Sequence, residues 1–320
     1  MRTLFSLFLI SIFSILNAQI ELSKPYTLMG SRFDITIVAK DSVEAQKNID
    51  LAVKEITRIE NLLSEWQPQT PVSQINNFAG IQPVKVPVEL INLTKTAIYF
   101  SKITNGAFDI SIAAMDKIWK FDGSMKSMPT ANEIKNSVRN VGYKNIIINE
   151  KENTIFLRNK GMKIGFGSIG KAYAAEKAKE LLLKNGVKSG IINAAGDIST
   201  WGKQINGKDW LIGVQNPFEP DGIEEVLKMN ANAVVTSGSY EKYAEIEGKR
   251  FSHIINPKTG IPSSGLVSVT IVGPDATTAN GISTSIMVLG LEKGKKLLKI
   301  FPKYRSIIID DKGKVFKNKY

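Results

Sequence analysis

The sequence predicts an α+β fold of mostly antiparallel strands packed with helices. Helical and strand-like segments alternate without the regular βαβ repeat that a doubly wound parallel sheet requires. Hydrophobic residues make up 43% of the chain and charged residues 22%, which is typical of a globular protein with a buried core. No repeat at solenoid or propeller spacing is found. We therefore expect residues 19–320 to form a single domain with two lobes.

The first eighteen residues are predicted to be a secretory signal peptide. Met1-Arg2-Thr3 supplies a positive start, Leu4 to Leu16 is almost wholly apolar, and Asn17-Ala18-Gln19 offers a small residue for cleavage. An uncleaved membrane anchor is the alternative, but this apolar run is shorter than the roughly 20 residues of a spanning helix. We expect an exported protein, periplasmic in a cell with two membranes and at most peripheral to the outer face of the inner membrane.

The N-terminal part predicts two strands and a long helix. Tyr26 to Ala39 reads as two strands broken at Gly30-Ser31, because apolar residues alternate in its second half. A helix follows from Asp41 or Ser42 to about Leu63, because apolar residues recur there at near-helical spacing. Those residues are Val43, Ile49, Val53, Ile56, Ile59 and Leu63.

The middle of the chain predicts two helices, a hairpin and a buried strand. One helix covers Val88 to Ile103 and stops before Asn105-Gly106, and a stronger one covers Ser168 to Leu183, with Gly186 as its C-terminal stop. The remaining elements are the hairpin of Asn145–Ile148 with Thr154–Leu157 and the strand Gly190–Asn193.

The C-terminal part predicts three strands, two helices and a closing hairpin. Short β-rich runs indicate the strands, and longer segments with helical periodicity indicate the helices. A hairpin turning at Asp311-Lys312-Gly313 closes the chain. The segments are strands Trp210–Gln215, Ile223–Met229 and Leu266–Val272, helices Ala276–Leu289 and Leu291–Ile300, and hairpin strands Ser306–Ile309 and Lys314–Phe316.

Charge and cysteine content exclude several classes of function. The net charge is +12, but the lysines are scattered and lack the interleaved aromatic residues of a nucleic-acid surface, so we expect no nucleic-acid partner. The chain has no cysteine, which excludes disulfides, thiolate catalysis and cysteine-bound metals. A zinc site is not expected either, because the chain has only one histidine.

Glycines and a lysine stand at the entrance to a predicted helix. The segment from Ile164 to Lys171 places Gly165, Gly167 and Gly170 around Ser168, where free backbone N–H groups would form an anion site. The spacing matches neither a P-loop nor a dinucleotide fingerprint. Close packing between a strand and a helix would explain the same glycines.

The only histidine, His253, ends a strand-like segment before a turn rich in Pro, Thr and Gly. It is the one side chain here whose ordinary pKa suits proton transfer near neutral pH. A buried structural histidine is the alternative interpretation.

Two polar segments complete the set of candidate site residues. Asn280, Ser283 and Thr284 lie on one helical face, from which their oxygens would bind a hard cation or simply cap the helix. Thr236 to Tyr240 is predicted to be a polar loop after a short strand.

Taken together, these segments resemble the FAD:protein FMN transferase family, also called ApbE-type flavin transferases. The resemblance runs from about Met29 to Gly290 and rests on motifs that occur in the same order. The motifs are Leu28 to Ser31, Leu62 to Trp66, Gly106 to Ser111, Gly165 to Tyr173, Asn193 to Asp197, Trp210 to Val214, Thr236 to Tyr240, Ser252 to Gly260 and Ala279 to Gly290.

The resemblance implies an ApbE-like, T-fold-like architecture with two lobes around a flavin cleft. It also implies an exported enzyme that uses FAD as substrate and Mg²⁺ as metal, moves FMN to a Thr or Ser of another protein, and releases AMP. The implied partner is a flavin-acceptor protein, either an FMN-binding domain or a subunit of a membrane redox complex. Some members of the family instead hydrolyse FAD to FMN and AMP.

The resemblance also implies roles for individual residues. His253 matches the functional histidine, a base for the attacking hydroxyl. Met29 and Trp66 match flavin-contact positions, and a tryptophan there would stack on the isoalloxazine ring. The positions that match further FAD contacts are Gly165, Lys171, Ile255 and a ligand-binding strand of Ala107, Phe108 and Asp109. The positions that match the metal site are Ser168, Asn280, Ser283 and Thr284.

The chain departs from the family pattern at charged positions of this site. The family usually has Asp where this chain has Gly165 and Asn280, and some members have Asp where it has Ser283. Neutral oxygens bind a hard dication less tightly than carboxylates, although Asp109 or Asp197 would supply charge from elsewhere in the chain. The alternatives are therefore an FAD-binding relative with weak or no transferase activity and an FAD pyrophosphatase.

Overall fold

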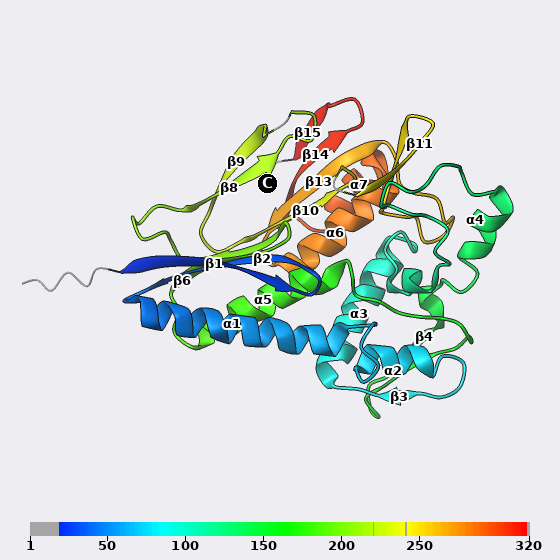
Figure 1. Cartoon of the computed structure of the whole chain (residues 1–320), viewed down its shortest axis with the longest axis horizontal. Helices are drawn as coiled ribbons and strands as arrows, with labels where there is room; N and C mark the ends of the chain where they lie inside the picture. Colours follow the sequence, from blue (N-terminus) through cyan, green and yellow to red (C-terminus); the bar gives the residue numbers. More distant parts are fainter. Residues whose placement is uncertain (1–18, 220, 241, 319–320) are drawn as a thin grey trace, which may run out of the picture.

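An eight-stranded antiparallel sheet forms the centre of the molecule (Figure 1). The computed structural model describes residues 19–219, 221–240 and 242–318, so the predicted signal peptide lies outside the described residues. Strands far apart in sequence are neighbours in the sheet, which brings segments from both halves of the chain together. In spatial order the strands are β1 (Ile20–Leu28), β2 (Ser31–Ala39), β6 (Ser189–Ala194), β7 (Asp197–Trp201), β10 (Ala233–Gly238), β13 (Leu266–Gly273), β14 (Arg305–Asp310) and β15 (Val315–Asn318).

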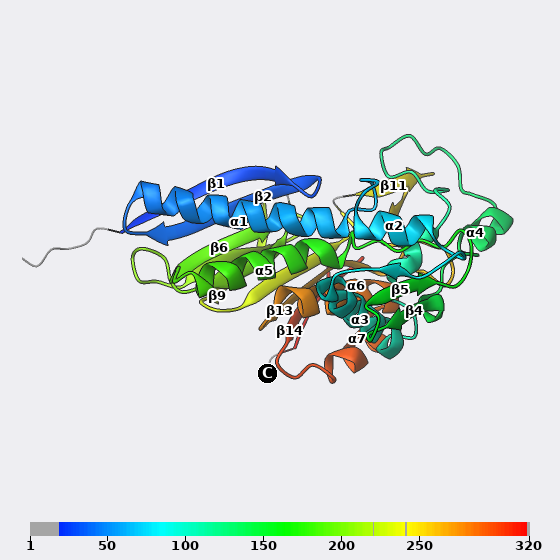
Figure 2. The same cartoon turned by 90° about the horizontal axis from the view of Figure 1, so that it is seen from below.

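Helices α1 (Ser42–Leu63), α5 (Ile169–Lys184) and α6 (Ala276–Leu289) cover one face of this sheet, and α7 (Leu291–Leu298) follows α6. Figure 2, seen from below, shows α1 and α5 side by side in front of the strands. Helix α1 begins at Asp41, whose side chain accepts a hydrogen bond from the Glu44 N–H.

The predicted apolar face of α1 is confirmed apart from one residue. Ile49, Ile56 and Ile59 are fully buried. Val43 was expected on that face but is 77% exposed. It lies two residues before the buried Ala45, which is about 200° around a helix, so it points to the other side.

A separate hairpin covers the other face of the sheet. Strands β8 (Trp210–Gln215) and β9 (Ile223–Met229) pair with each other. Alternate residues of β8 pack with Val234, Val272 and Ile307 of the large sheet in a second apolar cluster. The sheet is therefore buried on both faces.

A group of shorter elements forms the second lobe, to the right in Figure 1. Its small sheet has the order β3 (Val84–Lys85), β5 (Thr154–Leu157), β4 (Ile146–Asn149). Helices α2 (Pro71–Asn77), α3 (Val88–Ile103) and α4 (Ala131–Ser137) belong to this lobe, and hairpin β11 (Tyr243–Ile246) with β12 (Lys249–Ser252) packs near it against Trp119. One apolar core continues from the large sheet into α3 and β5.

The α+β class and the long elements expected from the sequence are confirmed. Five predicted segments coincide with the observed bounds of α3, α6, β5, β8 and β9. The prediction of a polar loop over Thr236–Tyr240 was wrong, because β10 extends through Gly238 and pairs with β13 on one side. Among the residues described, no helix combines the length and apolarity that crossing a membrane requires.

Candidate active site

Two adjoining cavities lie at the junction of the lobes. The first has a volume of about 390 Å³ and is lined by the N-terminus of α5, the end of β10, one face of α6 and the segments around residues 108 and 254. The second, of about 460 Å³, lies around Trp66 and Trp119. Both cavities are lined by Glu65, Ile112, Ala113 and Ile255, so they form one continuous recess.

The first cavity brings together most of the predicted site residues. Trp66 is not among them and lines the second cavity, where Lys117 Nζ lies 4.8 Å from the centre of its ring. Met29 and Ser283 line neither cavity. The residues brought together are Ala107, Phe108, Asp109, Gly165, Ser168, Lys171, His253, Ile255, Asn280 and Thr284.

Met29 and Ser283 do not line the recess but pack against residues next to it. Met29 forms the two-residue turn between β1 and β2 with Gly30, and both residues have positive φ. Its side chain lies beside Gly170 in the first turn of α5. Ser283 is fully buried, and its hydroxyl is 2.8 Å from that of Ser237 and 3.1 Å from the Asn280 carbonyl.

A cluster of neutral oxygens lies between α5 and α6. Ser168 Oγ is 2.9 Å from Asn280 Oδ1 and 2.9 Å from Thr284 Oγ1. Both contacts are hydrogen bonds, and the hydroxyl and amide oxygens of this triad are of the type that a hard cation such as Mg²⁺ accepts as ligands. Ser283 does not belong to the triad, because its hydroxyl is bonded to Ser237 and Asn280 behind it.

Asp197 supplies a negative charge beside this triad. Asn280 Nδ2 lies 3.3 Å from Asp197 Oδ2, and both residues are buried. Because the amide nitrogen faces the carboxylate, the amide oxygen is turned towards Ser168. The nearby carboxylate also polarises the amide, which makes its oxygen a better ligand for a cation.

The N-terminus of α5 faces the same cavity. Gly167, Ser168 and Lys171 line it, so the start of the helix lies beside a lysine, while the Gly170 N–H is already bonded to the Phe166 carbonyl. The Ser168 hydroxyl does not cap its own helix, because it is engaged with α6. This arrangement suits a phosphate group.

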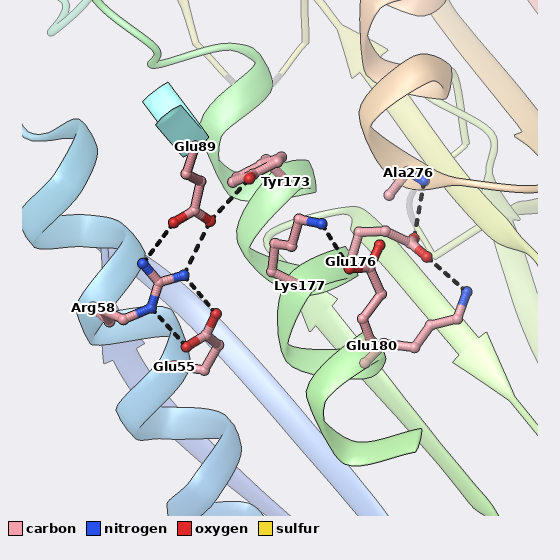
Figure 3. A network of polar contacts seen from close by, with 9 residues as sticks. Glu55, Arg58, Glu89, Tyr173, Glu176, Lys177, Glu180 and Ala276 are labelled. Carbon is pink, nitrogen blue, oxygen red and sulfur yellow. Dashed lines mark hydrogen bonds and ion pairs between the residues drawn. The ribbon is translucent and has the colours of Figure 1, made fainter. Parts of the chain in front are cut away.

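Two polar networks hold α5 against its neighbours (Figure 3). In the first, Arg58 of α1 pairs with Glu89 of α3 at 2.7 Å, and Glu89 accepts a hydrogen bond from Tyr173 Oη at 2.9 Å. In the second, the buried Glu176 pairs with Lys179 and accepts a hydrogen bond from the Ala276 N–H at the start of α6. These contacts fix the positions of Ser168 and Lys171 relative to α6.

His253 follows β12 and lines the cavity. Its Nδ1 lies 3.0 Å from the carbonyl oxygen of Lys242. Because a carbonyl only accepts, Nδ1 carries the proton in this contact, and Nε2 is the basic nitrogen of the neutral ring. The ring therefore has the tautomer that a general base requires.

A sequence model that describes the ApbE family matches residues 29–308. The chain belongs to the ApbE family. It is 32% identical over 269 residues to an FAD:protein FMN transferase of Klebsiella pneumoniae, which covers 83% of this chain and 82% of that protein. It is 26% identical over 266 residues to the Escherichia coli K12 protein of the same name, covering 80% and 76% of the two chains.

Solved ApbE structures share the fold. The ApbE protein of Thermotoga maritima superposes with a TM-score of 0.84 at 28% identity, covering 93% of this chain and 97% of that one. The flavin transferase ApbE of Vibrio cholerae gives a TM-score of 0.81 at 24% identity, covering 94% and 97%.

The segment Ala107–Asp109 is not the strand that the resemblance to the ApbE family had implied. It is an irregular turn that leads into a 3-10 helix at Ile110–Ala114. Asp109 caps this helix, accepting hydrogen bonds from the Ser111 N–H and hydroxyl and from the Tyr143 N–H. A carboxylate used in this way favours a turn over strand pairing. Burial raises the pKa of Asp109 despite these hydrogen bonds.

Glu65 and Ser237 also line the recess, although neither was predicted from the sequence to be a site residue. Glu65 precedes Trp66 and lines both cavities. Ser237 lies on β10 and is 3.4 Å from Thr284 Oγ1. The signal for Glu65 was a carboxylate next to a predicted aromatic contact. For Ser237 it was the run of hydroxyl residues at the end of an apolar strand.

Proposed function

We propose that this protein is an FAD:protein FMN transferase that moves FMN from FAD to a Thr or Ser of an acceptor protein. One observation carries this proposal: a helix N-terminus with Lys171, a cluster of cation-binding oxygens and His253 line the same cavity. The relatives that bear this name agree with it.

The reaction is a displacement at phosphorus. The acceptor hydroxyl oxygen forms a bond to the phosphorus of the FMN half, the bond from that phosphorus to the bridging oxygen breaks, and AMP leaves with that oxygen. The N–H groups of α5 and Lys171 would bind the pyrophosphate and stabilise the charge that develops on its oxygens. His253 Nε2 would accept the proton of the attacking hydroxyl.

We further propose that the site uses Mg²⁺. Ser168, Asn280 and Thr284 would hold the ion, and Asp197 would balance part of its charge through Asn280. A bound magnesium ion neutralises phosphate charge during such a transfer.

The partner and compartment are also proposals. The predicted signal peptide supports export, with a periplasmic site of action that is at most peripheral to the outer face of the inner membrane. A flavin-acceptor protein there would be an FMN-binding domain or a subunit of a membrane redox complex.

The test is incubation of residues 19–320 with FAD, Mg²⁺ and an FMN-acceptor domain, with AMP, FMN and protein-bound flavin resolved separately. Transfer predicts equal amounts of AMP and fluorescent acceptor. Free FMN and AMP without labelled acceptor would assign the chain as a pyrophosphatase. Intact FAD after hours with Mg²⁺, despite FAD binding, would assign it as a binding protein and overturn the proposal.

A further inference from the structure

Glu65 occupies the junction of the two cavities. It follows the end of α1 and is one of the residues that line both recesses. The side chain is partly buried, and no residue in the described part of the chain donates a hydrogen bond to its carboxylate. A partly desolvated acceptor without a protein donor, facing a ligand cavity, is available to a donor on the ligand.

Glu65 also fills the space that a side chain at position 165 would need. A Cβ atom built on Gly165 would lie 2.8 Å from Glu65 Oε2 and 3.0 Å from Ala113 Cβ. Non-bonded atoms do not approach so closely without strain. The carboxylate of Glu65 therefore occupies the place where a side chain at position 165 would begin.

The charges around Glu65 indicate which part of FAD it would face. Burial raises the pKa of Glu65, whereas Lys163 and Lys117 lower it. Asp116 lines the same cavity but is paired with Arg139. A carboxylate repels a pyrophosphate and attracts hydrogen-bond donors. Glu65 therefore suits a part of FAD that carries N–H donors.

We propose that the Glu65 carboxylate accepts a hydrogen bond from a ring N–H of FAD and takes the place of a carboxylate at position 165. This inference rests on the proposed function, because it takes FAD as the ligand. Two parts of FAD have the required chemistry: the imide N–H of the flavin ring and the amino group of adenine. The second cavity, with the exposed ring of Trp66, would hold whichever of these rings Glu65 binds.

The first experiment measures the Kd for FAD of the wild-type protein, Glu65→Gln and Glu60→Gln. Glu60 is a matched control on the last turn of α1, because it loses the same charge but lines neither cavity. We expect Glu65→Gln to weaken FAD binding about tenfold or more, as for hydrogen bonds to charged groups, and Glu60→Gln to bind as wild type. A Kd for Glu65→Gln within twofold of wild type would overturn the inference.

Separate binding of FMN and AMP then identifies the donor. If Glu65 binds the flavin imide, Glu65→Gln weakens FMN and leaves AMP unchanged, and the reverse result identifies the adenine amino group. Equal weakening of both ligands would contradict a contact with one ring.

Moving the carboxylate from position 65 to position 165 tests whether Glu65 takes the place of an acid at position 165. Gly165→Asp alone should weaken FAD binding, because two carboxylates would crowd one space. Glu65→Ala with Gly165→Asp should bind FAD at least fivefold more tightly than Glu65→Ala alone. If the double variant is no better than Glu65→Ala, position 65 does not replace position 165. Thermal unfolding of each variant confirms that it is folded.

The outcomes distinguish this inference from the proposed function. If the wild-type protein binds FAD through Glu65 but transfers no FMN, the inference about Glu65 stands and the proposed transferase function is wrong. If the wild type transfers FMN and Glu65→Gln binds FAD as tightly as the wild type, the proposed function stands and the inference about Glu65 is wrong. A wild-type protein that does not bind FAD overturns both.

Discussion

Asn280 and Asp197 divide two tasks between them: Asn280 contributes an oxygen to the polar cluster, and Asp197 contributes a negative charge. The Asn280 oxygen faces the hydroxyls of Ser168 and Thr284, and the negative charge lies behind it on Asp197. A neutral oxygen backed by a carboxylate still attracts a cation, but with less charge in direct contact. This difference gives a prediction about metal dependence.

Asn280→Asp should make the stability of the protein depend on magnesium. Without metal, two carboxylates would replace the amide–carboxylate contact at 3.3 Å, which should lower the free energy of unfolding by about 1.5–3 kcal/mol. Mg²⁺ should reverse this loss, because its positive charge would offset the repulsion between the two carboxylates. Thermal unfolding in EDTA and in Mg²⁺ measures both effects, with the exposed Asn92→Asp on α3 as control. Equal responses of the two variants to Mg²⁺ would contradict a cation site at Asn280.

His253→Ala should separate chemistry from binding. Loss of a general base lowers the rate of such reactions about 10²–10⁴-fold. The Kd for FAD should change less than about threefold, because Lys171 and α5 bind the phosphates. Single-turnover transfer and equilibrium FAD binding measure the two quantities. A variant that keeps wild-type transfer would show that the ring has only a structural role.

Glu65 should make FAD binding depend on pH. Because burial raises its pKa above the ordinary 4.5, the group is fully ionised only above that raised value. FAD affinity should therefore fall as pH drops through the raised pKa, and Glu65→Gln should remove that part of the profile. The difference between the two profiles isolates Glu65 from Lys163, Lys117 and Asp116, which face the same cavity. Parallel profiles would contradict the proposed role.

At the scale of elements, the position of α5 decides the geometry of the site. Its N-terminus carries Ser168 and Lys171, and its middle is tied to α1 and α3 through Glu89 and to α6 through Glu176 (Figure 3). Contacts made one turn along the helix, at Tyr173, and two turns along it, at Glu176, therefore fix residues that line the cavity.

Tyr173→Phe should weaken this attachment. Loss of the hydrogen bond to Glu89 should lower the free energy of unfolding by about 1 kcal/mol near pH 7, whereas Tyr99→Phe, on an exposed ring, should change it by less than about 0.5 kcal/mol. Arg58 and Tyr173 lower the pKa of Glu89 below 4.5, so the stability from these contacts is present above pH 4.5 and is lost as pH falls through the lowered value. Urea unfolding at pH 7 and at a series of lower pH values measures the change, and the difference between the wild type and Tyr173→Phe should shrink as pH falls through the lowered pKa of Glu89.

Long elements could be predicted from the sequence because each carries its own periodic pattern. Helix α6 begins after Asp275 and ends at Gly290, and the residues of β8 alternate between buried and exposed. Short elements were missed, among them α2 and α4, because seven residues give too few turns for a pattern. Their caps, Thr70 and Thr130, became recognisable only with the structure.

Site residues that belong to sequence motifs could be predicted, whereas contacts that arise only when the chain folds could not. Ser168 and Thr284 belong to motifs, and the structure places them in contact. The contact of Glu65 with Gly165 joins segments a hundred residues apart, and no local sequence pattern around either residue predicts it. Likewise, the three hydrogen bonds to Asp109 come from its own turn and from Tyr143. A strand-like sequence pattern does not predict such hydrogen bonds.

At the scale of the whole molecule, the recess lies where the two lobes meet and contains residues from both. A ligand that spans it should stabilise the folded chain as one unit. At a free FAD concentration of 100 times Kd, linkage predicts about 2.7 kcal/mol of added stability. Thermal unfolding with FAD should show a single transition that shifts upward, and the shift should be smaller for Glu65→Gln at the same FAD concentration. Two separate transitions, only one of which shifts, would show that FAD contacts one lobe.

The contact between Glu65 and Gly165 constrains how this protein can change over generations. The Glu65 carboxylate lies where a side chain at position 165 would begin, so an acid introduced at position 165 would force the flexible Glu65 side chain to move. The effect of a substitution at either position therefore depends on the residue at the other.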